Sequence, residues 1–122
     1  MKRLQDMETF TDEDVEAAIV RNEPDELHLV PLIVALASSD RSFAETVCIR
    51  LVSHLDGKVR GNAVTSLGHL ARRFRILDSA LVRPVIERAL LDPDEYVRAS
   101  AKSAADEIHQ FLHWDIAGHI YG

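Results

Sequence analysis

Residues near the C-terminus have the types and the spacing that could bind a metal ion. Asp106, His109 and His113 are three and four positions apart, so they share one face of a helix, and Asp115 and His119 follow. Two histidines at positions i and i+4 can bind one metal ion together. The spacing offers no third fixed ligand. His109 and His113 are therefore the only candidate ligands, and we expect neither a metal centre nor a bound cofactor.

Nucleophilic catalysis would need a reactive side chain, and Cys48 is the only cysteine. A single cysteine excludes an internal disulfide bond and a cysteine-based zinc finger. Cys48 is flanked by Val47 and Ile49, where we expect a small buried side chain rather than a nucleophile. The sequence contains no glycine-rich phosphate loop, no Gly-x-Ser-x-Gly elbow and no His-Glu-x-x-His pattern. We therefore expect a protein that is not an enzyme.

The charges are unevenly distributed along the 122 residues, whose formal net charge is −6. Residues 1–40 carry ten acidic and three basic side chains, residues 41–91 carry four and nine, and residues 92–122 carry six and two. Nucleic-acid binding through the basic middle segment would need a continuous basic face, which an acidic chain does not favour. Nucleic acid is therefore not the expected partner, although DNA binding through this segment stays open as an alternative.

The composition is that of one folded domain. Hydrophobic residues make up 47% of the chain and charged residues 28%, with only 5 glycines and 4 prolines. The longest apolar run, residues 29–37, is interrupted by Pro31 and is shorter than the roughly 18 residues that a membrane helix needs. No apolar stretch follows the basic residues at the N-terminus. We therefore expect a cytoplasmic protein that does not enter a membrane.

Apolar residues recur at steps of three and four over most of the chain, which predicts an all-α fold. We expect six antiparallel helices, over residues 12–22, 26–38, 42–55, 58–74, 80–91 and 95–112. Asp56 is the predicted N-cap of the fourth helix, and Pro31 would kink the second helix unless it lies in the first turn. Residues 1–10 are expected to be a loose lead-in and residues 113–122 a tail that caps the last helix, within one domain spanning 1–122.

A shift of 38 residues places the third and fourth predicted helices on the fifth and sixth. Six pairs are then identical: Val47 and Val85, Arg50 and Arg88, Asp56 and Asp94, Val59 and Val97, Arg60 and Arg98, and Ala63 and Ala101. These identities indicate an internal repeat. A second register sets Pro31 against Pro84 and Phe43 against Tyr96 and would pair the helices differently. The sequence alone does not decide between the two pairings.

The repeated pattern resembles the second helix of HEAT-type repeats. It reads Asp56…Val59-Arg60-x-x-Ala63-Val64-x-x-Leu67-Gly68-x-Leu70, and a copy extends from Asp92 to Ala105. The resemblance covers residues 42–112 and is weak over residues 1–41, where the Val-Arg signature with its Asp three positions before and its Ala four positions after Val is absent. It implies a short α-solenoid of about three helix–turn–helix repeats, in which each repeat packs only against its neighbours.

Arg60 and Arg98 belong to this repeated pattern. Each follows an acidic residue by four positions, which predicts local ion pairs with Asp56 and Asp94. The HEAT-type resemblance implies that these arginines also connect the turns of adjacent repeats.

The resemblance also implies that the solvent side of the second helices binds a partner. The candidate interaction residues on helix 58–74 and helix 95–112 are Asn62, Thr65, His69, Arg72, Arg73, Ser103, Glu107 and Gln110. Helix 12–22 adds an acidic edge formed by Asp12, Glu13 and Glu16.

Size, acidity and helical repeats together resemble, in a general way, the immunity or inhibitor proteins of bacterial toxin systems. There a negative surface covers a basic toxin and speeds association. We therefore expect a non-enzymatic protein-binding module whose partner is a protein, with a basic toxin as the specific expectation. An enzyme or enzyme accessory of the HEAT-like type, such as a lyase or a protein that acts on nucleic acid, stays open as an alternative.

Overall fold

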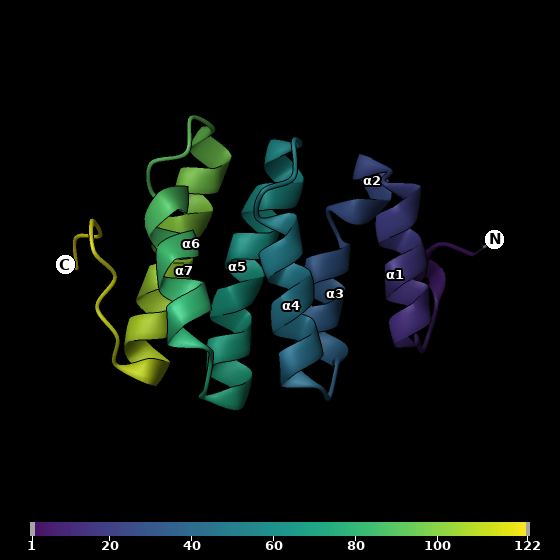
Figure 1. The fold of residues 1–122 in the computed structure, drawn as a ribbon, viewed down its shortest axis with the longest axis horizontal. Coiled ribbons are helices and arrows are strands. Elements are labelled where there is room, and N and C mark those ends of the chain that lie inside the picture. Colours follow the sequence, from purple (N-terminus) through teal and green to yellow (C-terminus); the bar gives the residue numbers. More distant parts are fainter. Residues whose placement is uncertain (1, 122) are drawn as a thin grey trace.

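The computed structural model describes residues 2–121, and these residues form only helices and loops. The elements are η1 (Leu4–Asp6), α1 (Asp12–Arg21), α2 (Pro24–Leu27), α3 (Val30–Ala37), α4 (Arg41–Leu51), α5 (Gly57–Phe74), α6 (Ser79–Ala89) and α7 (Glu95–Leu112). Figure 1 shows them side by side, following the order of the chain from one end of the molecule to the other. The prediction of an all-α fold is confirmed.

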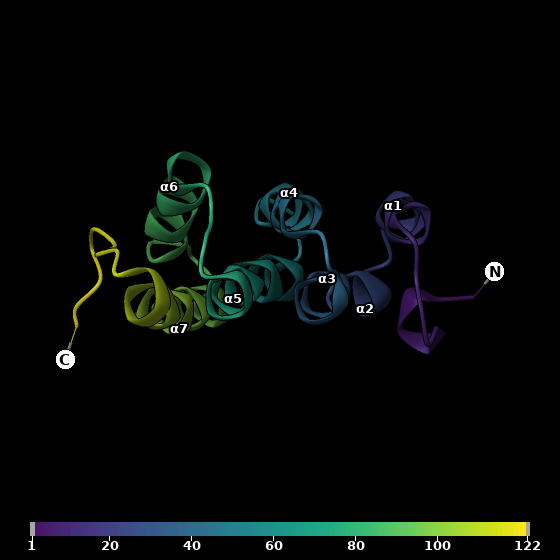
Figure 2. The ribbon, with the colours of Figure 1, turned by 90° about the horizontal axis from the view of Figure 1, so that it is seen from below.

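The helices lie in two layers (Figure 2). One layer holds α1, α4 and α6, and the other holds α2, α3, α5 and α7. Each helix of the first layer is therefore followed in the chain by a helix of the second layer. This alternation agrees with the pairing predicted by the 38-residue shift, which joins α4 to α5 and α6 to α7.

The predicted helix 26–38 is divided into α2 and α3, so residues 2–121 contain seven α-helices instead of the expected six. Pro31 lies in the first turn of α3, where a missing N–H removes no helical hydrogen bond. The chain bends at His28 and Leu29 instead of kinking within one helix. The helix predicted over residues 42–55 ends at Leu51, because residues 52–55 form the turn that leads to α5.

Side-chain caps fix where α1, α4, α5, α6 and α7 begin. Thr11 and Asp14 form a reciprocal capping box at the start of α1. Aspartate carboxylates accept backbone N–H groups at the starts of α4, α5, α6 and α7, and these caps are Asp40, Asp56, Asp78 and Asp94. The predicted cap at Asp56 is confirmed, and it accepts from the N–H groups of Lys58 and Val59.

α5 lies in the middle of the stack, and its apolar stripe forms part of the core. Val59, Ala63, Leu67 and Leu70 are fully buried, as predicted. Gly68 allows α7 to approach closely, because a Cβ atom at this position would lie 3.1 Å from the Ala104 Cα. The two longest helices therefore pack nearly backbone to backbone.

The N-terminal segment is not loose over residues 3–7, contrary to expectation. Leu4 is buried, and its N–H donates to Glu26 at 3.0 Å, while Arg3 pairs with Glu23. Glu26 is itself fully buried and accepts two hydrogen bonds from Arg21, which holds the pKa of the carboxyl below its usual range. A carboxylate buried in this way fixes the start of the chain against α2.

The C-terminal tail covers the last helix pair. Ile116 is buried in the core, and Trp114 packs against it. The Ile116 N–H donates to the Tyr121 hydroxyl at 2.8 Å, which closes the tail on itself. Met1 and Gly122 lie outside the described residues. Within residues 2–121, no helix is both long enough and apolar enough to cross a membrane.

Candidate interaction face

Three side chains of α5 form a narrow stripe that is at least partly exposed to solvent. Thr65, His69 and Arg72 occupy positions i, i+4 and i+7, and most residues around them on α5 are buried. On α7, Ser103 and Gln110 are exposed. We call this set, together with Glu107, the interaction row.

Arg72 joins the two helices of the interaction row. Its Nη1 lies 3.1 Å and 3.2 Å from the two carboxylate oxygens of Glu107. The structure therefore brings one candidate residue of α5 next to one candidate residue of α7. Whether they bind a partner stays a prediction.

His69 is one of the half-buried members of the interaction row. Burial lowers the pKa of its imidazole, the cation of Arg72 lowers it further, and the carboxylate of Glu107 opposes the shift. The Nδ1 atom is buried and has no hydrogen-bond partner among the described residues. Burial and the Arg72 cation both favour the neutral form of the ring.

Asn62 does not belong to the exposed face, so its prediction as a surface residue is wrong. It is 5% exposed, and its Nδ2 donates to the His28 carbonyl at 2.7 Å. Its Oδ1 accepts from the Tyr96 hydroxyl. The amide is buried because it connects α5 to the bend before α3 on one side and to α7 on the other.

Arg73 is exposed but is held by the neighbouring helix. Its Nη1 donates to the carbonyls of Ala35 at 2.6 Å and Ser38 at 2.9 Å. These carbonyls lie at the C-terminal end of α3, where helical partners are missing. The observed contacts of Arg73 are therefore structural.

The acidic edge lies in the other layer of the molecule. Asp12, Glu13 and Glu16 are exposed on α1, as expected, but α1 is in the layer opposite the interaction row. Glu16 pairs with Arg50 of α4 at 2.6 Å. The structure therefore does not bring the two sets of candidate residues together on one face.

Two of the three histidines near the C-terminus, His109 and His119, pair with separate carboxylates. His109 Nδ1 lies 2.9 Å from Asp115, and His119 Nε2 lies 2.8 Å from Asp106. His113 ends α7 in a left-handed conformation, with φ at 60°. Within residues 2–121, no group of three or more His, Cys, Asp or Glu side chains is placed to hold a metal ion.

Cys48 is fully buried in the core, as predicted. Burial raises the pKa of its thiol to about 12. Since the thiolate is the nucleophilic form, this side chain is unsuited to nucleophilic chemistry at neutral pH.

Arg60 links two successive turns between the layers. Its Nε and Nη2 lie 3.0 Å from the two carboxylate oxygens of Asp92, in the turn between α6 and α7. Its Nη1 donates to the carbonyls of His54 and Leu55, in the turn between α4 and α5. The two charged side chains are 17% and 15% exposed, and the guanidinium lowers the pKa of Asp92.

The predicted local ion pairs of Arg60 and Arg98 are wrong. Asp56 and Asp94 are occupied as helix caps, so their carboxylates accept backbone N–H groups. Arg98 instead donates from Nη1 to the carbonyls of Asp92 and Pro93. It therefore reproduces the turn contacts of Arg60 without the carboxylate pair.

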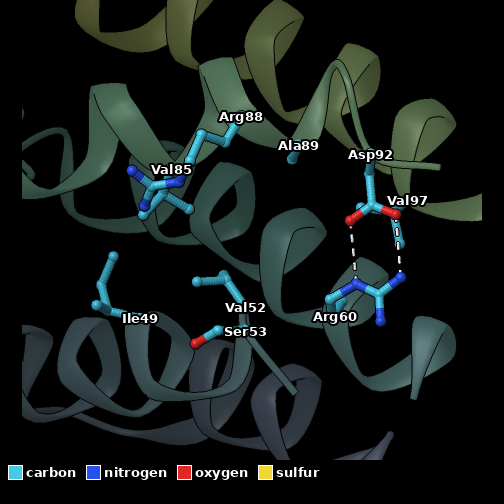
Figure 3. Close-up of a pocket in the computed structure, with 9 residues that line it drawn as sticks. All are labelled: Ile49, Val52, Ser53, Arg60, Val85, Arg88, Ala89, Asp92 and Val97. Carbon is cyan, nitrogen blue, oxygen red and sulfur yellow. Dashed lines mark hydrogen bonds and ion pairs between the residues drawn. The ribbon is translucent and has the colours of Figure 1, made fainter. Parts of the chain in front are cut away.

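A groove that the sequence did not reveal opens between α4 and α6 (Figure 3). It encloses about 450 Å³, and its lining residues are Ile49, Val52, Ser53, Arg60, Val85, Arg88, Ala89, Asp92 and Val97. Val52 and Val85 have the helical spacing of ordinary core residues. The apolar periodicity of the sequence therefore does not indicate that α4 and α6 leave a space between them. Figure 3 shows the Arg60–Asp92 pair at one end of the groove.

Comparison with known proteins gives one structural likeness. No family model matches the chain, and no curated protein sequence matches it. A chain in the crystal structure of a CDI complex from Cupriavidus taiwanensis LMG 19424 has a similar fold, with a TM-score of 0.73 and 24% sequence identity. The similarity covers 91% of this chain and 98% of that chain. The chain therefore shares its fold with one component of a CDI complex.

Proposed function

We propose that this chain is a non-enzymatic protein-binding module, and more narrowly an immunity-type protein that binds and neutralises a toxin. The observation that carries the proposal is the similarity in fold to a chain of a CDI complex over nearly the whole of both chains. CDI denotes contact-dependent inhibition, and that chain is part of an assembly. A chain of the same fold and length is suited to a corresponding role.

The interaction row supports a protein partner. It presents polar and charged side chains from two helices that are packed closely at Gly68, so the surface is preorganised. The net charge of −6 favours a basic partner, because complementary charge raises the association rate. DNA binding is less well supported, because Arg60, Arg72 and Arg73 are engaged within the chain.

The alternation of the two layers and the turn-to-turn contact of Arg60 support a HEAT-like repeat architecture. We propose on this basis that the molecule is a short solenoid of about three repeats. In such an architecture the layer that holds α5 and α7 is the partner-binding one, which is where the interaction row lies.

A growth-rescue experiment tests the toxin-neutralising role. A toxin domain encoded beside the gene for this chain is expressed in a laboratory bacterium, with or without the chain. We expect the chain to restore growth and to co-purify with the toxin domain. We also expect the association rate to fall as salt rises, since exposed charges are screened. Absence of both rescue and complex formation would reject the proposed function.

Exposed substitutions then locate the binding face. Ser103→Arg and Gln110→Arg each add a positive charge to the interaction row, where a basic partner would be repelled. We expect each to weaken the complex about tenfold. Ser42→Arg adds the same charge on α4, in the opposite layer, and is the matched control. Equal affinities of all three variants would place the partner elsewhere on the molecule.

A further inference from the structure

The groove between α4 and α6 has apolar walls, and the space between them is not filled by the described residues. Ile49 lines it from α4 and Val52 from the turn that follows α4. Val85 and Ala89 line it from α6, and Val97 contributes from α7. A volume of about 450 Å³ lies within the range of sites that take organic ligands or side chains. The groove is therefore large enough for one or two partner side chains.

Arg88 is an unpaired cation in this apolar groove. It is exposed, and among residues 2–121 it has neither a hydrogen bond nor an ion pair. Figure 3 shows its side chain reaching along α6 to Val85, at the end of the groove where Ile49 lies. The only acidic residue in the lining is Asp92, and both of its carboxylate oxygens accept from Arg60. The groove therefore contains no free carboxylate for Arg88.

The internal repeat shows which group is missing. Arg50 is the equivalent of Arg88 under the 38-residue shift. Arg50 Nη1 lies 2.6 Å from the Glu16 carboxylate, which the preceding first-layer helix α1 provides. For Arg88 the preceding first-layer helix is α4. The groove residues of α4 and of the turn after it are Ile49, Val52 and Ser53, none of which is acidic. A position that holds a carboxylate between α1 and α4 is therefore open between α4 and α6.

We propose that this groove binds an extended segment of a partner protein that carries an aspartate or glutamate next to a large apolar side chain. The carboxylate pairs with Arg88, in the way that Glu16 pairs with Arg50, and an arginine can hold it with two hydrogen bonds. The apolar side chain packs between Val52 and Val85. This inference rests on the proposed protein-binding function and names a second contact surface for it.

The dimensions set the length of the bound segment. α4 and α6 each contain 11 residues, so the groove between them is at most about 16 Å long. An extended chain of about five residues spans this distance. The negative charge is required only of this segment, so the rest of the partner can be basic.

A random 12-residue peptide library displayed on phage, selected on the full chain, tests the proposal. We expect enriched peptides to share an acidic residue beside Leu, Ile, Phe or Trp. Fluorescence anisotropy with the synthesised peptides then gives their affinities. Arg88→Ala should weaken binding about tenfold, as expected for a charge-assisted hydrogen-bonded pair. Arg50→Ala removes the same charge from the equivalent position and is the matched control, with unchanged affinity.

A substitution that blocks the groove tests its apolar walls separately. Ser53 is exposed and lines the groove, so Ser53→Trp fills the space without entering the core. We expect loss of peptide binding with an unchanged circular dichroism spectrum. The inference is overturned if no peptide is enriched, if enriched peptides lack acidic residues, or if they bind the Arg88→Ala and Ser53→Trp variants as tightly as the unmodified chain.

The peptide experiment and the growth-rescue experiment fail in different ways. Peptides that depend on Arg88, combined with no toxin rescue, would reject the immunity role and keep the groove as a binding site. Toxin rescue combined with peptides that are indifferent to Arg88 would reject the groove and keep the proposed function.

Discussion

Replacing Arg60 by alanine should destabilise the protein more than the same replacement of Arg98. Arg60 makes four hydrogen bonds, two to the Asp92 carboxylate and two to turn carbonyls. Arg98 makes only the two carbonyl contacts. The substitution of Arg60 also leaves Asp92 without its partner at 15% exposure. We expect the free energy of unfolding to fall by about 2–3 kcal/mol in Arg60→Ala and by about 1 kcal/mol in Arg98→Ala. The value for Arg60 lies between those typical of surface and of buried ion pairs.

Urea unfolding followed by circular dichroism measures both losses, and thermal unfolding provides a second readout. For 122 residues an unfolding entropy of about 0.26 kcal/mol/K makes each kcal/mol equal to roughly 4 °C in Tm. The expected decreases in Tm are therefore about 10 °C for Arg60→Ala and about 4 °C for Arg98→Ala. Losses that agree within about 0.5 kcal/mol would refute the reasoning, because the carboxylate pair would then contribute nothing measurable.

Three further predictions concern close packing, burial and charge. Gly68→Leu should lower the free energy of unfolding by about 1–3 kcal/mol, because even the Cβ of the new side chain would lie 3.1 Å from the Ala104 Cα. Urea unfolding checks this, and Ser103→Leu, on the exposed side of α7, is the control that should be tolerated. Cys48 should not react with a thiol reagent at pH 8 in the folded protein, because burial raises the pKa of its thiol to about 12. In 8 M urea it should react fully. Rapid reaction of the folded protein would contradict this prediction. In an NMR titration His69 should have a pKa below its usual value of about 6.5. Glu107→Gln should lower this pKa further and Arg72→Gln should raise it, because the carboxylate favours the charged ring and the cation disfavours it. Shifts of the opposite sign would exclude this arrangement of charges.

The all-α fold and the helix starts could be predicted because both depend on residues close together in the chain. The stripe of Val59, Ala63 and Leu67 has helical spacing, and the cap at Asp56 needs only the next three residues. The 38-residue shift also indicated the pairing of helices that the two layers show. The division between α2 and α3 was missed, although Pro31 marked its position.

The errors concern contacts between residues far apart in the sequence. Asn62 is polar and has the spacing of an exposed residue, but its partner carbonyl at His28 is 34 positions away. The carboxylate that binds Arg60 is 32 positions away, beyond the four-residue reach of a local helix pair. The groove arises from space between α4 and α6, and a sequence pattern shows which residues are apolar but not how closely two helices approach.

The close contact of α5 with α7 at Gly68 also has a consequence for the order in which the chain folds. These are the two longest helices, at 18 residues each, and only α6 and its turns separate them. Contacts between segments near in sequence cost little loop entropy, so this part can form first. The N-terminal part is built from helices of 10, 4 and 8 residues, and it joins the rest of the molecule mainly where α3 packs against α4 and α5. Amide hydrogens of α2 should therefore exchange with solvent long before those in the middle of α5.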